Sequence, residues 1–271
     1  MNSAVHTKIQ YWGWNKAAPY YDDLWQNQLR NVQKLLLSEA SVNPGDKVLD
    51  ICCGSGLVTI PAAQAAEQGE TCGTDFSEEM LEIARSVAQN HNLNNVRFEI
   101  MNAENLTFPD GYYHVVINAL GIMYLADPVK AIREMYRVLK PGGRATVLVW
   151  GSRRNCGWAD VFPIIDKRVA SEVCPLFFQM GTGQTLLYSF QSAGFVDTEE
   201  QRISDILHFD NDQDAADAMF IGGPVALAWN RFNPDIRQLV YAEYLDSLKP
   251  WKKGDEYDIP AEFVLVKGIK R

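Results

Sequence analysis

The stretch that decides the fold is Val48-Leu49-Asp50-Ile51-Cys52-Cys53-Gly54-Ser55-Gly56. Its apolar first half predicts a short buried strand, and its two glycines predict a sharp turn into a helix. The free N–H groups at the start of such a helix, together with a backbone that a ligand can approach closely, favour a nucleotide-like ligand. We therefore expect a binding site at the end of this strand.

The turn departs from the dinucleotide pattern. That pattern needs a third glycine three residues after Gly56, where this chain has Thr59. Asp50 lies within the turn region, where its charge would repel a pyrophosphate but suits a ligand that carries an ammonium and a sulfonium. These residues favour S-adenosylmethionine (SAM) over NAD or FAD.

A second carboxylate follows about 20 residues later, where nucleotide-binding sheets hold a ribose. Asp75 ends a predicted strand and could accept hydrogen bonds from both ribose hydroxyls. Phe76 and Met80 could sandwich the adenine. The structural alternatives are that Asp75 only caps the next helix and that Phe76 and Met80 belong to the core.

Strands and helices alternate along the rest of the chain. The predicted strands cover 47–52, 70–75, 96–101, 114–119, 143–150, 195–203 and 262–267, and the predicted helices cover 57–68, 78–91, 128–139 and 185–193. This order predicts an α/β fold with a Rossmann-like, doubly wound and mostly parallel sheet of seven strands.

No repeat or linker divides the chain, so we expect a single domain over 1–271. Its expected parts are an N-terminal helical lid over 1–42, a SAM-binding core over 43–150 and the remaining strands over 151–271, with cap insertions at about 151–184 and 205–257. Both insertions are rich in aromatic and apolar residues, and we expect them to shape a substrate pocket.

Four segments together resemble the class I SAM-dependent methyltransferases, and in particular the methyltransferase type 11 group that includes quinone-biosynthesis C-methyltransferases. They are D-x-x-C-G-x-G at 50–56, G-x-D-x-S-x-x-M-L at 73–81, Asn102-Ala103-Glu104-Asn105-Leu106-Thr107-Phe108, and Arg137-Val138-Leu139-Lys140-Pro141-Gly142-Gly143. The family commonly has Asp at the position of Asn102, whose carbonyl oxygen can still accept a hydrogen bond from adenine. It also usually has Asp at the position of His114, which we interpret as a structural change.

The resemblance implies a set of cofactor-binding residues. It places Asp50, Gly54 and Gly56 at the methionine portion of SAM, Asp75 at the ribose, Asn102 and the backbone of Ala103 at the adenine edge, Asn118 beside the methionine or methyl group, and Tyr20 or Tyr21, before Asp22, at the methionine carboxylate. Cys53 and Glu104 join the expected cofactor-binding residues without an assigned part of SAM, and the alternative for Cys53 is a small buried hydrophobic residue. For the two tyrosines, helix packing is an equal alternative.

The expected function is transfer of a methyl group from SAM to a small organic acceptor. Such a reaction needs proximity and exclusion of water more than a fixed catalytic set, and His208 is the candidate base if the acceptor must lose a proton. The aromatic residues of the lid and insertions favour an apolar or aromatic acceptor of natural-product or quinone type. Two alternatives remain open: SAM-assisted cyclisation or rearrangement, and a SAM-sensing module without catalysis.

Composition and charge limit the classes of partner that we expect this protein to bind. The net charge of −9 gives no basic footprint for nucleic acid, and no apolar run is long enough to insert stably in a membrane. Met1–Gln10 lacks the charged and apolar regions of a signal peptide, so we expect a cytoplasmic protein. Five cysteines without a C-x-x-C pair predict no metal site. We expect SAM as the cofactor, S-adenosylhomocysteine as its product, and a monomer or homodimer.

Overall fold

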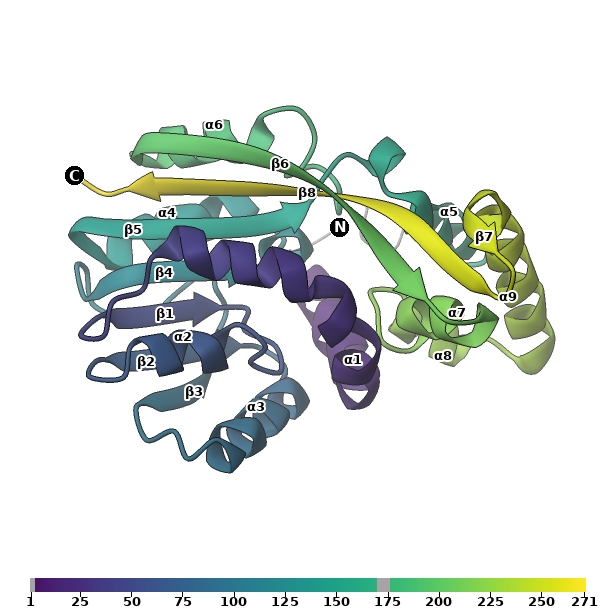
Figure 1. Cartoon of the computed structure of the whole chain (residues 1–271), viewed down its shortest axis with the longest axis horizontal. Helices are drawn as coiled ribbons and strands as arrows, with labels where there is room; N and C mark the ends of the chain where they lie inside the picture. Colours follow the sequence, from purple (N-terminus) through teal and green to yellow (C-terminus); the bar gives the residue numbers. More distant parts are fainter. Residues whose placement is uncertain (1–2, 170–175) are drawn as a thin grey trace.

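The computed structural model describes residues 3–169 and 176–271, and they form one mixed sheet flanked by helices (Figure 1). Seven strands make a continuous path in the order β3 (Val96–Ile100), β2 (Glu70–Asp75), β1 (Lys47–Ile51), β4 (Tyr113–Ala119), β5 (Leu139–Trp150), β8 (Glu256–Ile269) and β6 (Val196–Phe209). The two-residue β7 (Lys252–Lys253) pairs with β8 alone. The expected Rossmann-like α/β fold is confirmed.

Most of the sheet is parallel. β1 pairs in parallel with β2 and β4, β2 with β3, and β4 with β5, whereas β8 runs antiparallel to both β5 and β6. The central strands are apolar runs because helices cover both of their faces. Four three-residue runs are accordingly inaccessible to solvent or nearly so, namely 115–117, 147–149, 264–266 and, in β1, 48–50.

Helices cover the two faces of the sheet (Figure 1). On one face lie α1 (Ser3–Ala40), α2 (Thr59–Ala65) and α3 (Glu78–Asn90), and on the other lie α4 (Pro128–Val138) and α6 (Thr185–Ala193). The side-chain oxygens of Ser77 and Asp127 cap α3 and α4 by accepting from the backbone N–H three residues later. Each predicted core helix is present, with ends that differ by a few residues.

α1 is the longest helix, and it carries Pro19 in its interior. Proline removes one helical hydrogen bond and crowds the preceding turn, so a long helix bends there. In Figure 1 the second half of α1 lies across the sheet, and the first half turns past the sheet edge. The first half thereby reaches the carboxyl ends of the strands.

Beyond the sheet, β6 and β8 continue together as a twisted two-stranded ribbon (Figure 1). Around it gather α5 (Val161–Asp166), α7 (Asp212–Phe220), α8 (Ala226–Arg231) and α9 (Pro234–Leu248), with the 3-10 turns η2 (Arg153–Asn155), η3 (Gly157–Asp160) and η4 (Lys249–Trp251). We call these helices and the ribbon the cap. The expected insertion at 205–257 was therefore too wide, because its two ends are strand that buries Leu207, Phe209 and Tyr257.

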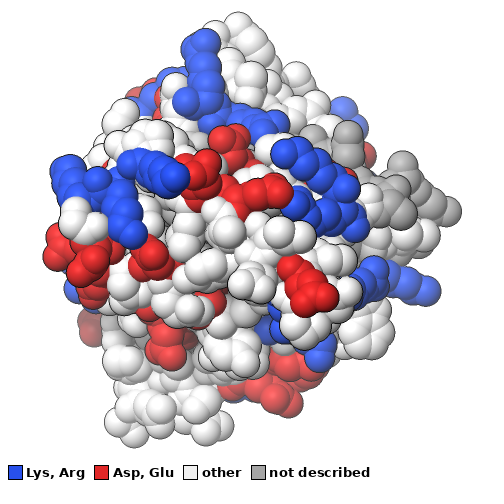
Figure 2. Space-filling view, turned by 90° about the vertical axis from the view of Figure 1, so that its right-hand side faces the viewer, with Lys and Arg blue, Asp and Glu red and all other residues white. Residues whose placement is uncertain are grey.

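The surface at the cap end is mixed in charge. Figure 2 shows acidic and basic side chains interleaved over this face rather than gathered by sign. Several of these side chains form ion pairs, as in Arg168 with Glu243 and Lys253 with Asp258 at 2.7 Å. Elsewhere on the molecule, Lys267 pairs with Glu39 at 2.8 Å. Within the described ranges, no helix combines the length and apolar character needed to cross a bilayer.

Candidate functional site

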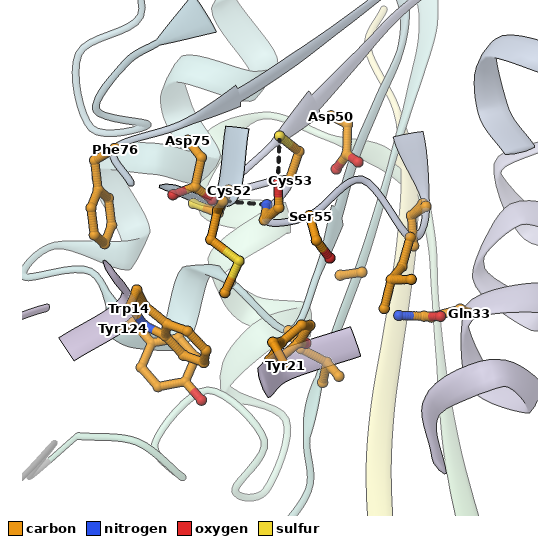
Figure 3. Close-up of a pocket in the computed structure, with 17 residues that line it drawn as sticks. Trp14, Tyr21, Gln33, Asp50, Cys52, Cys53, Ser55, Asp75, Phe76 and Tyr124 are labelled. Atoms are coloured by element: carbon orange, nitrogen blue, oxygen red, sulfur yellow. Dashed lines mark hydrogen bonds between the residues drawn. The ribbon is translucent and has the colours of Figure 1, made fainter. Parts of the chain in front are cut away.

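A pocket lies where the carboxyl ends of β1, β2 and β4 meet the first half of α1 (Figure 3). It encloses about 620 Å³, part of it open to solvent. The side chains and turns that line it are Trp14, Tyr21, Gln33, Asp50, Cys52, Cys53, Gly54, Ser55, Leu57, Val58, Asp75, Phe76, Met80, Ala119, Leu120, Gly121 and Tyr124. Ligands bind at this edge of open α/β sheets, where the strand order reverses.

The turn after β1 has the backbone conformation that the glycines predict. Gly54 and Gly56 have φ of +53° and +88°, a region that other residues rarely adopt. Cys52 adopts φ of 54° without being glycine, which stores strain directly in the pocket wall. At Gly56 a side chain would also meet Cβ of Ala84 at 3.2 Å, so the turn can lie close to α3 only with glycine there.

Asp75 ties this turn to the next one. Its carboxylate accepts hydrogen bonds from the N–H groups of Gly54 and Ser77, both at 2.9 Å. Burial raises its pKa, and these backbone donors oppose that change. Ser77, not Asp75, caps α3. Asp75 therefore faces the pocket beside the glycine turn, with its carboxyl group already hydrogen-bonded to two backbone donors.

Asp50 lies at the other side of the turn and is 1% exposed. One carboxylate oxygen accepts a hydrogen bond from Oγ1 of Thr59 at 2.6 Å, and the other oxygen, Oδ1, has no hydrogen-bond partner among the residues that the structure describes. Burial raises the pKa of Asp50 to about 7, with a smaller contribution from the charge of Asp75. A buried carboxylate oxygen without a partner costs free energy, and a cationic ligand group in the pocket would remove that cost.

Aromatic side chains close the pocket from below in the view of Figure 3. Trp14 and Tyr21 come from α1, and Tyr124 comes from η1 (Ile122–Tyr124) after β4. The ring of Trp14 meets those of Tyr21 and Tyr124 edge to face, with centroids 5.7 and 4.9 Å apart. Oγ of Ser55 donates to Asp22 and so holds α1 against the glycine turn.

A second cavity lies behind this aromatic wall, and we call it the aromatic chamber. It shares Trp14, Tyr21, Leu120 and Tyr124 with the pocket, and its other lining residues are Trp25, Leu29, Trp150, Trp158, Phe177, Gly223 and Pro224. The sheet, α1 and the cap all contribute to it. Nε1 of Trp25 donates to the carbonyls of Ala218 and Gly222, both at 3.0 Å, which fixes the chamber wall to the cap.

The structure brings most of the predicted cofactor residues together. Tyr21, Asp50, Cys53, Gly54, Asp75, Phe76 and Met80 all line the pocket, and Gly56 shapes the turn above it. The sequence interpretation missed Gln33 and Tyr124, and it counted Trp14 only among the lid aromatics. One signal was present for Gln33, because a polar residue stands on the apolar face of a helix.

Other predicted residues lie outside the lining. Tyr20 is 48% exposed and directed away from the pocket, so of the two tyrosines only Tyr21 reaches it. Asn118 is fully buried; it donates to the carbonyl of Ile51 at 2.7 Å and accepts from Ile122 N at 3.1 Å. Its amide thus joins β4 to β1, and contact of Asn118 with the methionine portion or the methyl group stays a prediction.

The loop after β3 is likewise held by internal bonds. Oδ1 of Asn102 accepts from the N–H of Glu104 at 2.9 Å, and the carboxylate of Glu104 accepts from the N–H groups of Ala126 and Asp127 at 2.8 and 3.1 Å. Ala103 is buried. Contact of Asn102, Ala103 and Glu104 with adenine stays a prediction.

His208 does not reach the pocket, and its selection as the candidate base is corrected here. It lies on the ribbon part of β6, with its side chain 51% exposed, and Nδ1 contacts Asp258 at 2.8 Å. This hydrogen bond raises the pKa of His208. Its neighbours Leu207 and Phe209 are buried, so strand alternation turns the His208 side chain to the opposite, exposed face of β6. His114 accepts from Lys47 N at the opposite end of the sheet, in agreement with a structural role.

The described part of the chain contains no group of three or more His, Cys, Asp and Glu side chains arranged to hold a metal.

Fold and site together define a nucleotide-binding α/β protein whose pocket presents acids and aromatics rather than a pyrophosphate cradle.

Comparison with known proteins identifies the family. Residues 48–143 match a family described as a methyltransferase domain. The demethylmenaquinone methyltransferase of Geobacillus sp. (strain WCH70) is 30% identical over 178 residues, which are 60% of this chain and 76% of that protein. The chain belongs to the class I SAM-dependent methyltransferases.

The match to other relatives is shorter. The demethylmenaquinone methyltransferase of Listeria welshimeri is 38% identical over 122 residues, 45% of this chain. The chain thus spans about half the length of that relative, 52%. The family match at 48–143 covers the glycine turn and the strands from β1 to the start of β5, and it ends before the cap.

Solved structures support the fold. The YcgJ protein of Bacillus subtilis has a TM-score of 0.61 and 21% identity, over 89% of this chain and 99% of that one. The [4+2]-cyclase SpnF has a TM-score of 0.59 and 20% identity, over 91% of this chain and 82% of that one.

Proposed function

We propose that this protein transfers a methyl group from SAM to a small apolar or aromatic acceptor. One observation carries the proposal. A pocket with two buried carboxylates on its sheet side shares its aromatic wall with an apolar chamber that the cap and α1 enclose. The two cavities would place a charged donor and an apolar acceptor on opposite sides of Trp14, Tyr21 and Tyr124.

The pocket residues fit SAM. Asp75 would accept the ribose hydroxyls, and Phe76 and Met80 would contact the adenine at the same end of the pocket (Figure 3). Asp50, with its unpartnered oxygen, would face the cationic methionine portion at the other end. SAM supplies a methyl group on a sulfonium, which is already an excellent leaving group. The chain then contributes alignment and exclusion of water, for which the aromatic wall is suited.

The chamber supports a restricted class of acceptor. Its described lining contains no carboxylate and no imidazole, and its titratable groups are the phenols of Tyr21 and Tyr124. Burial raises the pKa of Tyr21, so this phenol stays neutral. An acceptor that ionises without a strong base, such as an acidic phenol or an activated ring carbon, fits this lining. Relatives named demethylmenaquinone methyltransferase support a quinone-type acceptor.

The test is incubation of the purified protein with methyl-labelled SAM and a panel of candidate acceptors. The panel contains naphthols, hydroxyquinones, aliphatic amines, and transfer RNA. We expect label in a naphthol or hydroxyquinone and none in RNA. Label in RNA would overturn the proposal. SAM binding without label in any product would instead favour cyclisation, rearrangement or a sensing role.

A further inference from the structure

Gln33 occupies a position on α1 where the helix is otherwise apolar. The residues that α1 buries against the sheet include Trp25, Leu29, Val32, Leu36 and Ala40, each 4% exposed or less. Gln33 lies one turn after Leu29 and before Leu36, and it is 8% exposed. Burying a glutamine amide on such a face costs free energy unless the amide is hydrogen-bonded.

The Gln33 amide has no such bond within the described residues. No hydrogen bond joins its side chain to any of them, and it lines the pocket. In Figure 3 Gln33 lies at the end of the pocket nearest Asp50 and Ser55, while Asp75 and Phe76 lie at the far end. Gln33, whose side chain has no hydrogen bond to a described residue, and Asp50, whose Oδ1 has none either, therefore share one end of the same pocket.

The chemistry of these two side chains is complementary to an α-amino acid. An α-ammonium group needs acceptors, which Oδ1 of Asp50 and the Gln33 carbonyl oxygen can provide. An α-carboxylate needs donors, and the Gln33 NH₂ is a donor of this kind. Ser55 is less available, because its hydroxyl already donates to Asp22.

We propose that Gln33 binds the amino-acid end of SAM directly and makes the pocket selective for ligands that carry this end. The inference rests on the proposed function and goes beyond it, because the family resemblance assigns only Tyr20 or Tyr21 of α1 to the cofactor and gives Gln33 no role. Gln33 acts in binding and specificity, and it takes no part in the methyl transfer itself.

The test compares two ligands that differ only at this end. S-adenosylhomocysteine carries the α-amino acid, and 5′-methylthioadenosine lacks it. Gln33→Met keeps the side-chain length and removes the amide. Titration calorimetry on the whole protein should show S-adenosylhomocysteine binding weakened about tenfold or more, since hydrogen bonds to charged groups are the strong ones. Binding of 5′-methylthioadenosine should stay within about twofold of wild type.

Two control variants make the outcome specific. Gln26→Met, on the exposed side of the same helix, should change neither affinity. Asp75→Asn should weaken the binding of both ligands, because both carry the ribose. The inference is overturned if Gln33→Met binds S-adenosylhomocysteine as tightly as wild type, or if the variant loses affinity for both ligands by the same factor. If wild type binds neither ligand, the proposed function itself fails, which is a distinguishable result.

Discussion

Asp50 is the residue of the pocket whose charge state we expect to change when SAM binds. Its carboxylate is buried, one oxygen accepts a hydrogen bond from Thr59, and the other has no partner in the described part of the chain. Burial raises its pKa to about 7, so near neutral pH the free protein is a mixture of protonated and ionised forms. A cation bound beside it would favour the ionised form.

This predicts a pH-dependent affinity for S-adenosylhomocysteine. Below pH 7 the protein must lose the Asp50 proton on binding, and above pH 7 it need not. The affinity should therefore rise about tenfold from pH 6 to pH 8 and then level off. Calorimetry at pH 6 in buffers of different ionisation enthalpy should detect release of the proton. Asp50→Asn should abolish that release; the same buffer dependence in this variant would assign the proton to another group.

Only part of the site could be predicted at the level of residues. Asp50, Gly54 and Asp75 follow from local pattern, because a strand, a glycine turn and an acid at the next strand end always meet at one edge of a parallel sheet. Gln33 and Tyr124 could not be placed, since they lie far apart in sequence and converge only through the path of α1 and the turn after β4. His208 was placed in an insertion because the predicted strand ended at 203, whereas β6 continues to Phe209 and its alternation leaves His208 on the exposed face.

Among the elements, the ends of β1 and β4 form the rigid base of the pocket. Asn118 joins them through the carbonyl of Ile51 and the N–H of Ile122. Gly121, which follows, lies so close to Cys52 that an added Cβ would be 2.4 Å from its Cβ. The floor of the pocket is therefore held by packing and backbone bonds rather than by the ligand.

We predict that Asn118→Leu destabilises the protein by roughly 2–4 kcal/mol, because it leaves several buried backbone groups without partners. Urea unfolding without ligand measures this loss. Asn105→Leu, at an exposed position, is the matched control and should change the unfolding free energy little. Unchanged stability of Asn118→Leu together with lost SAM affinity would show instead that Asn118 contacts the cofactor, as the family resemblance implies.

Element boundaries were predicted well in the core and less well at β8. Pro260 lies within Glu256–Ile269 and indicates a strand break on pattern alone. The structure accommodates it because pairing with β5 ends at Phe263, so one side of β8 is free of that neighbour at Pro260. The seventh strand is accordingly longer than the expected 262–267.

At the scale of the whole molecule, the chamber exists because three separate parts meet. Leu29 comes from α1, Trp150 from the end of β5, and Gly223 from the cap. The methyltransferase-domain match at 48–143 includes none of these three residues. We therefore expect acceptor choice to depend on parts of the chain outside the shared core.

Leu29→Phe tests whether the chamber determines acceptor binding separately from SAM binding. The larger ring would narrow the chamber without reaching the lining of the SAM pocket, so the KM for the acceptor that takes the label should rise about tenfold. Affinity for S-adenosylhomocysteine should stay unchanged, which also controls for folding. Leu239→Phe, on the exposed surface of α9, should affect neither quantity. Equal loss of both affinities in Leu29→Phe would argue against separate donor and acceptor cavities.

Binding of SAM in the pocket at the ends of β1, β2 and β4 underlies every role proposed for this chain. Calorimetric titration of the purified protein with S-adenosylhomocysteine, beside NAD as the competing ligand class, tests it most directly. We expect saturable binding of one S-adenosylhomocysteine per chain and none of NAD. Absence of S-adenosylhomocysteine binding, or binding of NAD in its place, would contradict it.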